Sequence, residues 1–137
     1  MDVTFAHLCD YATISRENKL SVLGIFSQIN ALEIPFVHPQ AYLAFEVEAD
    51  YAEIGKPFRI EIEIVGDEGV KIFRAEAELT LQSSPTQPKP VDRPRSEQIL
   101  PITGLNLKRA GTYDINLFIN QRLLKQLRFR VAPIGGQ

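Results

Sequence analysis

The fold is decided by the sequence Tyr113-Asp-Ile-Asn-Leu-Phe-Ile-Asn-Gln-Arg-Leu-Leu-Lys-Gln-Leu-Arg-Phe-Arg-Val131. Apolar and polar residues alternate on both sides of its polar centre, which is typical of two half-buried β-strands. A three-residue loop at 120–122 keeps the apolar residues of both strands on one face of the hairpin. It also sets Asp114 opposite Arg128, an opposite-charge pair. The stretch therefore predicts a β-hairpin with a defined register.

On the outer face of this hairpin, the same register sets Phe118 opposite Leu124. They form the one cross-strand apolar pair that the sequence places on a surface. A two-residue turn would instead set apolar residues opposite polar ones unless a β-bulge corrected the register. We expect Phe118 and Leu124 to form a contact surface.

A second hairpin is predicted in the middle of the chain. Two alternating segments, 58–64 and 70–81, flank the turn signal Gly66-Asp-Glu-Gly69. A four-residue loop sets Ile62 opposite Phe73 on the inner face. On the outer face this register predicts two opposite-charge pairs: Glu61 lies opposite Arg74, and Arg59 lies opposite Glu76.

The N-terminal part also reads as strands. The segment 3–12 has apolar residues at both odd and even positions, as in a strand covered on both sides. The segment 20–29 is expected to be its hairpin partner. Gly24 in the second segment indicates a bulge or a close approach by another backbone. The segment 33–39 carries two prolines, so we expect it to cross between strands rather than lie centrally in a sheet.

These segments predict an all-β fold of about seven to eight strands in a single domain, 1–137. An antiparallel β-sandwich of immunoglobulin-like topology fits the pattern, and a closed β-barrel is the alternative. The proline-rich stretch 82–95 is expected to be a mobile loop within the domain. The tail 132–137 is expected to fray.

Composition limits the function classes. The chain has 137 residues, 45% of them hydrophobic, and a single cysteine, Cys9, which suits a reducing compartment. No signal peptide or membrane-spanning run is apparent, so we expect a cytoplasmic protein. Residues 1–80 are acidic and residues 81–137 basic, which indicates either neighbouring strands that neutralise each other or a dipolar surface. The basic residues come in ones and twos and lack an interleaved aromatic platform, which argues against nucleic-acid binding.

Two resemblances add to this reading. The stretch Ala110-Gly-Thr-Tyr113 resembles the tyrosine corner of immunoglobulin-like domains, although the chain lacks their tryptophan and disulfide. The set Val3-Thr-Phe-Ala, Asp10-Tyr-Ala12, Gly24-Ile-Phe26 and Phe36-Val-His-Pro39 resembles a family of small stand-alone bacterial proteins classed as a domain of unknown function. That resemblance implies one cytoplasmic β domain and supplies no catalytic or ligand residues.

Candidate chemistry is sparse. His7, Cys9 and His38 lack the spacing of a structural zinc site, and we expect them to serve packing and turns. Asp10 with Tyr11 offers a carboxylate beside a phenol, but the sequence places no second polar group with them. The acidic rows 46–50 and 61–63 are expected to be solvated rather than to bind Ca²⁺. We therefore expect no catalytic residue, metal or cofactor.

The leading hypothesis is a non-enzymatic protein-interaction or assembly module that binds an unknown protein or a second copy through Phe118 and Leu124. The alternative is a small-ligand or carbohydrate binder, or an enzyme. It would use the loops 13–19, 35–40 and 104–110 at one end of the sandwich, in a pocket containing Asp10 or His38. A third hypothesis is a regulatory subunit whose loop 82–95 orders on binding.

Overall fold

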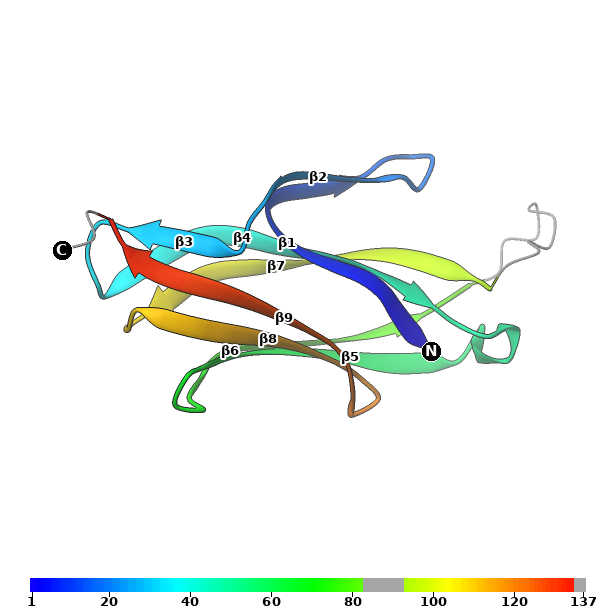
Figure 1. Ribbon diagram of the computed structural model, residues 1–137. Helices are drawn as coiled ribbons and strands as arrows, with labels where there is room; N and C mark the ends of the chain where they lie inside the picture. The colour runs from blue at the N-terminus through cyan, green and yellow to red at the C-terminus, as the bar shows by residue number, and fades with distance from the viewer. Residues whose placement is uncertain (83–92, 135–137) are drawn as a thin grey trace.

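The computed structural model describes residues 1–82 and 93–134. These residues form nine strands and a short 3-10 helix, η1 (Figure 1). The elements are β1 (Asp2–Ile14), β2 (Leu20–Ile25), β3 (Gln28–Ala31), β4 (Phe36–Glu48), η1 (Tyr51–Glu53), β5 (Pro57–Gly66), β6 (Lys71–Thr80), β7 (Arg95–Leu107), β8 (Gly111–Ile119) and β9 (Arg122–Pro133). Among the described residues, no helix is long and apolar enough to cross a lipid bilayer.

The strands form two sheets that pack face to face (Figure 1). The four-stranded sheet has the order β2-β1-β4-β7, and the five-stranded sheet has the order β3-β9-β8-β5-β6. Neighbouring strands are antiparallel except β3 and β9, which are parallel. Each sheet keeps two edge strands, so the fold is the predicted β-sandwich and not a closed barrel.

The core lies between the two sheets and is built from alternate positions of each strand. In β5 and β8, every second residue is buried and the intervening ones are half-buried or exposed. This alternation is what the period-2 pattern predicts. The largest fully buried side chains are Phe45, Phe129, Leu43, Ile60, Ile62, Ile64, Ile102, Leu107, Ile115 and Leu117.

The topology is immunoglobulin-like. Strands β9, β8, β5 and β6 lie side by side, as G, F, C and C′ do in immunoglobulin variable domains. Tyr113 lies near the start of the penultimate strand, and its hydroxyl donates a 2.6 Å hydrogen bond to the carbonyl of Arg109. This bond confirms the tyrosine corner, which joins the β7–β8 connection to β8.

The half of the β8–β9 hairpin that lies away from its turn has the predicted register. Ile115 lies opposite Leu127, and Asp114 lies opposite Arg128, whose Nε donates a 2.9 Å hydrogen bond to the Asp114 carboxylate. The alternation of apolar and polar residues was therefore sufficient to pair these two strands.

The turn of this hairpin differs from the prediction and changes one surface residue. It has two residues, Asn120 and Gln121, both with positive φ, as a type I′ turn requires. The register then shifts at a bulge, so that Phe118 faces Leu123 and not Leu124. Leu124 is instead partly buried against the main core. The bulge is the correction that a two-residue turn needs to keep apolar residues inside.

The β5–β6 register differs from the prediction by two residues. Ile62 lies opposite Ala75 rather than Phe73, and a bulge interrupts the ladder after Ile64. The inner face is unchanged, because a shift of two residues preserves parity. The predicted ion pairs form as diagonal contacts, at 2.9 Å between Arg59 and Glu76 and 3.4 Å between Arg74 and Glu61.

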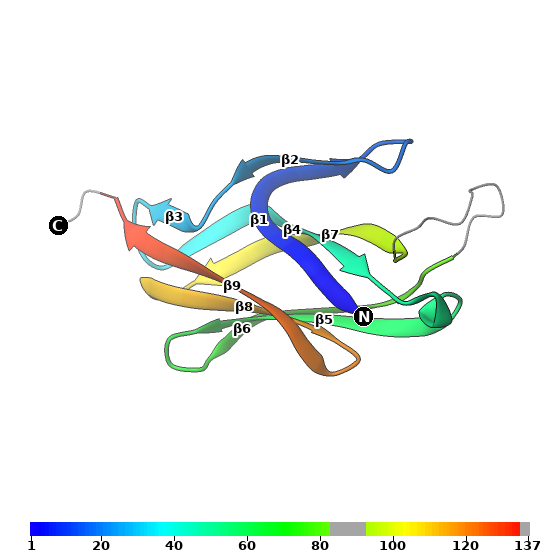
Figure 2. The same cartoon turned by 45° about the vertical axis from the view of Figure 1, so that its right-hand side comes forward.

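Strand β1 separates from β4 about half-way along its length. Its pairing with β4 ends at Cys9, and residues 11–14 pair only with β2. At the bend, Gly24 has a φ of +68°, and a β-carbon there would lie 2.3 Å from the Asp10 carboxylate. The group that comes close to Gly24 is therefore the side chain of Asp10 and not another backbone, as the sequence had suggested. We call residues 11–25 the arm; it projects along the outside of the four-stranded sheet (Figures 1 and 2).

The arm packs on the four-stranded sheet through a second, small apolar cluster. Cys9, Ala12 and Ala44 are buried there. The half-buried residues around them are Leu20, Val22, Tyr42 and Ile99. The expectation that β1 is covered on both sides holds for only part of the strand: Leu8 packs in the main core and Cys9 in this cluster, but Tyr11 is exposed.

Two predicted segments have different boundaries. The single strand expected at 20–29 is split, because the chain crosses after Phe26 and β3 pairs with β9 in the other sheet. The crossing segment expected at 33–39 instead contributes the start of β4. Pro39 is tolerated there because β1 has already left, so this part of β4 pairs with β7 alone.

The mobile loop predicted at 82–95 and the frayed tail predicted at 132–137 lie largely outside the residues that the structure describes. Residues 83–92 and 135–137 lie outside the described residues. Arg95 already belongs to β7, and Arg93 makes several ion pairs. Ala132 and Pro133 pair with β3.

Candidate functional site

The outer face of the arm is apolar and exposed. Tyr11 lies directly opposite Leu23, and Ile25 follows on the same face. Their exposed fractions are 50% for Tyr11, 67% for Leu23 and 57% for Ile25. No charged residue occurs between Leu20 and Leu32. Contiguous exposed apolar residues of this kind often mark interaction sites.

Sequence reasoning missed this surface because both faces of the arm are apolar. One face covers the second cluster, so a strand buried on both sides and a strand with one free face have the same pattern. The signal that could have indicated it was the uncharged run 20–32, since exposed edge strands usually carry a charge.

A second apolar surface lies on the outer face of the five-stranded sheet. Phe118 is half-buried, and Leu123 opposite it is 49% exposed. On the other side of Phe118 lies Glu61, which belongs to the ion-paired row of β5 and β6. An apolar centre beside charged residues is a common arrangement at protein interfaces.

The ligand-site candidates Asp10 and His38 lie in different environments, and neither lines the cavity described below. Asp10 is exposed at the bend of the arm. His38 lies between the rings of Phe26 and Phe36, at centroid distances of 5.9 and 6.2 Å. Its Nε2 is buried and has no hydrogen-bond partner among the described residues. His38 is therefore a half-buried residue packed beside two aromatic rings.

The three loops proposed for a ligand site do not gather. Residues 36–38 pair with residues 105–107 as neighbouring strands. The turn of the arm, which contains 13–19, lies at the opposite end of the sandwich from the β3–β4 connection in both views (Figures 1 and 2). The site expected from these three loops is therefore not assembled.

A cavity of about 380 Å³ lies elsewhere, beside the tyrosine corner. The β5–β6 turn supplies one wall and the β7–β8 connection the other. Apolar contacts come from Val70, Ile72 and the ring of Tyr113. This volume is within the range of small-molecule sites.

The charged residues of the cavity are mostly engaged with one another. Glu68 forms an ion pair with Arg109 across the two walls. Asp67 accepts a 3.2 Å hydrogen bond from the backbone N–H of Thr112. Lys108 makes no ion pair among the described residues, so its ammonium group is available to an anion.

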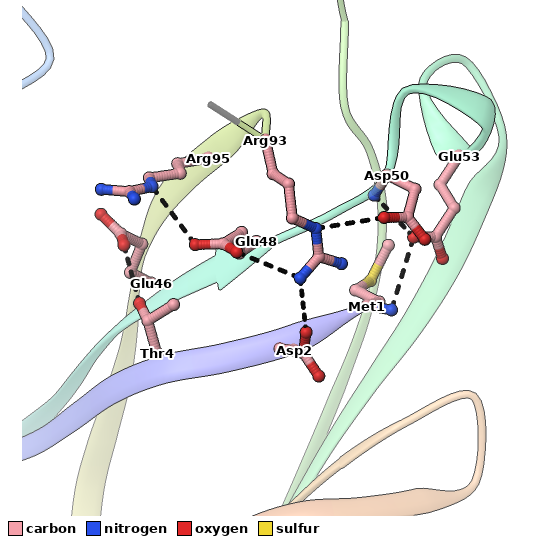
Figure 3. Close-up of polar contacts among 9 residues, drawn as sticks. All are labelled: Met1, Asp2, Thr4, Glu46, Glu48, Asp50, Glu53, Arg93 and Arg95. Carbon is pink, nitrogen blue, oxygen red and sulfur yellow. Dashed lines mark hydrogen bonds and ion pairs between the residues drawn. The ribbon is translucent and has the colours of Figure 1, made fainter. Parts of the chain in front are cut away.

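A charged cluster joins the start of β1, the end of β4 and the start of β7 (Figure 3). The guanidinium of Arg93 lies 2.7 Å from Asp2, 3.0 Å from Glu48 and 3.1 Å from Asp50. Its hydrogen bond lowers the pKa of the Asp2 carboxyl below the ordinary value. Arg95 contacts Glu48 from the other side at 3.3 Å. Much of the acidic row predicted to be solvated is thus neutralised by arginine.

Beside this cluster, two carboxyl groups face each other. Glu46 on β4 lies directly opposite Glu97 on β7. Burial, and then the neighbouring Glu46, raises the pKa of Glu97. Thr4 donates a 2.7 Å hydrogen bond to Glu46. Burial and the facing carboxyl group together favour the protonated form of Glu97.

The sequence matches the model of a family of unknown function, DUF6941, over residues 4–132. The chain belongs to this family. The DUF6941 match spans both sheets and the arm, and it confirms the resemblance to a domain of unknown function. A comparison with curated proteins finds no match.

Among solved structures, this DUF6941 chain is similar to an alkylpurine DNA glycosylase from Pseudomonas fluorescens bound to DNA containing an abasic site analog, with 11% identity and a TM-score of 0.44. That alignment covers 92% of this chain but only 30% of the glycosylase chain. An immunoglobulin-like protein from Pseudomonas aeruginosa is similar over 96% of this chain and 95% of its own, with 12% identity and a TM-score of 0.41.

Proposed function

We propose that this chain is a non-enzymatic protein-interaction module that binds a protein partner through the outer face of the arm. The observation that carries the proposal is the exposure of Tyr11, Leu23 and Ile25 on one face of a hairpin that pairs with no other strand. Fully burying an aliphatic side chain contributes about 1.5–3 kcal/mol. Leu23 and Ile25 are two such residues, and together with the aromatic ring of Tyr11 they are enough for an interface centre.

The arm is suited to present this face. Its other face is anchored on Ala44, Tyr42 and Ile99, so the exposed residues are held in place rather than frayed. The ring of Tyr11 packs edge-on against Tyr42 at 5.8 Å. A preorganised apolar face binds with a smaller loss of conformational entropy than a flexible segment.

The test is affinity purification of the tagged protein from its own host. Leu23→Asp places a charge in the centre of the face without touching the core, and it should lose the partners that the wild type retains. Asn30→Asp is the matched control and should retain these partners, because Asn30 is exposed on β3, in the other sheet. Identical partner sets for the wild type and Leu23→Asp would contradict the proposal.

The surface at Phe118 and Leu123 is a further contact site for a protein or a second copy. It keeps the role predicted for Phe118, with Leu123 in the place of Leu124. Phe118→Asp should weaken binding and leave the arm-dependent partners unchanged. Size-exclusion chromatography with light scattering on both proteins separates loss of a partner from loss of self-association.

A second candidate function, small-ligand binding, is favoured by the cavity beside the tyrosine corner. Its apolar wall and the available ammonium of Lys108 would suit a small apolar carboxylate. Phenylbutyrate is a suitable probe and phenylbutylamine its cationic control. Saturable changes in the NMR chemical shifts of Val70 and Thr112 with phenylbutyrate, but not with phenylbutylamine, would support this function. No change with either compound would contradict it.

We place this function in a bacterial cytoplasm. The support is the single cysteine, Cys9, which is buried and unpaired in the second cluster. A protein stabilised without disulfides is suited to a reducing compartment. Fractionation of the host with an antibody against the protein would test this location.

A further inference from the structure

The outer edge of the five-stranded sheet is an unpartnered strand, β6. It pairs with β5 on one side only and runs for ten residues, Lys71–Thr80, without glycine or proline. The other edge strands of the described residues are interrupted or short. Pro101 interrupts β7, the left-handed Gly24 interrupts β2, and β3 has four residues. Of these edges, β6 is therefore the best suited to pair with another strand.

The inner face of β6 is incompletely covered. Phe73, Ala75, Ala77 and Leu79 lie opposite Ile64, Ile62, Ile60 and Phe58 of β5. The β5 residues are at most 3% exposed, whereas the four on β6 are only half-buried. A strand added at this edge would bury the remaining apolar surface.

The outer face of β6 carries charges of both signs. Arg74 is followed at alternate positions by Glu76 and Glu78. Glu76 is held by Arg59, and Arg74 has only long contacts of 3.4 and 3.5 Å to Glu61 and Glu76. Glu78 makes no ion pair within the described part of the chain, so it is free to accept a cation.

We propose that two copies of this chain pair through β6, antiparallel and about a two-fold axis at Glu76. This register sets Arg74 opposite the partner's Glu78, and Glu78 opposite the partner's Arg74. On the inner face it sets Phe73 opposite the partner's Leu79, and Ala75 opposite the partner's Ala77. The edge is therefore complementary to itself in charge and in apolar contacts.

Neighbouring registers are less favourable. A two-fold axis at Arg74 sets Arg74 opposite the partner's Arg74. An axis at Ala77 sets Glu76 opposite the partner's Glu78, and symmetry repeats this like-charge pair. An axis at Ala75 also sets Arg74 opposite the partner's Glu76, but Glu76 is already bound to Arg59. That axis leaves Glu78 opposite Ile72 and, on the inner face, Phe73 opposite Ala77 rather than Leu79. With the axis at Glu76, the only like charges that meet are the two Glu76 carboxylates, and each is already bound to its own Arg59.

This inference rests on the proposed function, since it names a second copy as one partner, but it uses a different surface. The paired copies would form one ten-stranded sheet and double the Phe118–Leu123 surface. The arm lies in the other sheet, so it stays free to bind a protein partner. Variants of the two surfaces therefore have separable effects.

The test is sedimentation velocity over a concentration series. The wild type should dimerise, and Arg74→Glu or Glu78→Arg should each weaken the dimer by about tenfold or more, because two attractive pairs become two repulsive ones. The double variant Arg74→Glu with Glu78→Arg should restore it. Gln126→Glu, an exposed change on β9, should leave the dimer unchanged.

A cross-link tests the register directly. Glu76→Cys should form a disulfide-linked dimer on mild oxidation, and Thr80→Cys should not, because only position 76 meets its own copy. A monomeric wild type at all concentrations, or single variants that dimerise like the wild type, would overturn the inference. If partner capture still depended on Leu23 in that case, the proposed function would stand and only the β6 pairing would fail.

Discussion

The hydroxyl of Tyr113 donates a 2.6 Å hydrogen bond to the carbonyl oxygen of Arg109, four residues earlier in the chain. The bond ties the β7–β8 connection to the start of β8, and the tyrosine ring stacks on Phe129 at 5.3 Å. The geometry of this corner also forms one wall of the cavity.

Tyr113→Phe removes that hydrogen bond and keeps the ring. We expect the free energy of unfolding to fall by about 1 kcal/mol, because the Arg109 carbonyl loses its donor. Urea denaturation measures the change. The control is Tyr11→Phe, whose hydroxyl makes no hydrogen bond among the described residues and which should differ by less than about 0.5 kcal/mol. Equal effects of the two changes would show that the corner does not stabilise the fold.

Gly24→Ala should destabilise the bend of the arm. A left-handed non-glycine residue costs about 1–2 kcal/mol, and the new methyl would also displace the whole side chain of Asp10. Gly104→Ala is the control, because Gly104 has a φ of +64° but a methyl group there would meet no atom within 4 Å. Gly24→Ala should therefore cost more than Gly104→Ala in urea denaturation. Equal costs would mean that Asp10 moves away freely.

Leu124→Asp tests the corrected register of the last hairpin. Leu124 is partly buried against the core, so we expect a loss of about 1–3 kcal/mol in unfolding free energy. Leu123→Asp should change it by less than about 0.5 kcal/mol, because Leu123 lies on the outer face. The reverse order would favour a three-residue turn with Leu124 outside.

Glu97→Gln should stabilise the protein at neutral pH by roughly 0.5–1 kcal/mol, because it removes one of two facing carboxylates. The pKa of Glu97 is raised in the folded state, so the folded protein retains this proton to higher pH than the unfolded chain does. Stability therefore falls as the pH rises above about 4.5. Thermal unfolding across pH 4 to 8 should show a smaller fall in the variant. An unchanged pH profile would argue against the coupled pair.

Arg93→Gln should lower the melting temperature at neutral pH and low salt, because three carboxylates lose their common partner. The Asp2 pKa is lowered in the folded state, so its contribution exists above pH 3.8 and is lost as the pH falls through the folded value. The difference from the wild type should then shrink at low pH. Arg95→Gln, which loses one contact to Glu48, should have a smaller effect.

The sequence was enough to predict the sandwich, the β8–β9 pairing near Asp114 and the tyrosine corner, because each depends on local alternation or a short motif. It did not predict the two-residue turn, since Gln121 adopts a positive φ that its residue type does not indicate. The β5–β6 register was missed for another reason. Arg59 reaches Glu76 diagonally, so the same charge pair fits two registers.

The candidate site was harder to predict than the fold. Whether Leu23 is buried depends on where the arm bends, and the bend depends on Gly24 and Asp10, which come from different strands. The sequence prediction placed Leu124 on the outer face because it assumed a three-residue loop. The bulge beside the two-residue turn shifts the pairing by one position, and Leu124 packs against the core. The cavity could not be anticipated, because Glu68 and Arg109 on its two walls are 41 residues apart in the chain and meet only in the folded sheet.

Site-specific photo-cross-linking in the native host tests the central claim most directly. A photoreactive residue at position 23, on the exposed face of the arm, should give a discrete cross-linked protein. The same residue at position 126, on the polar outer face of β9, should not give that product. No product at position 23, or the same products at both positions, would contradict the account of this chain as an interaction module that acts through its arm.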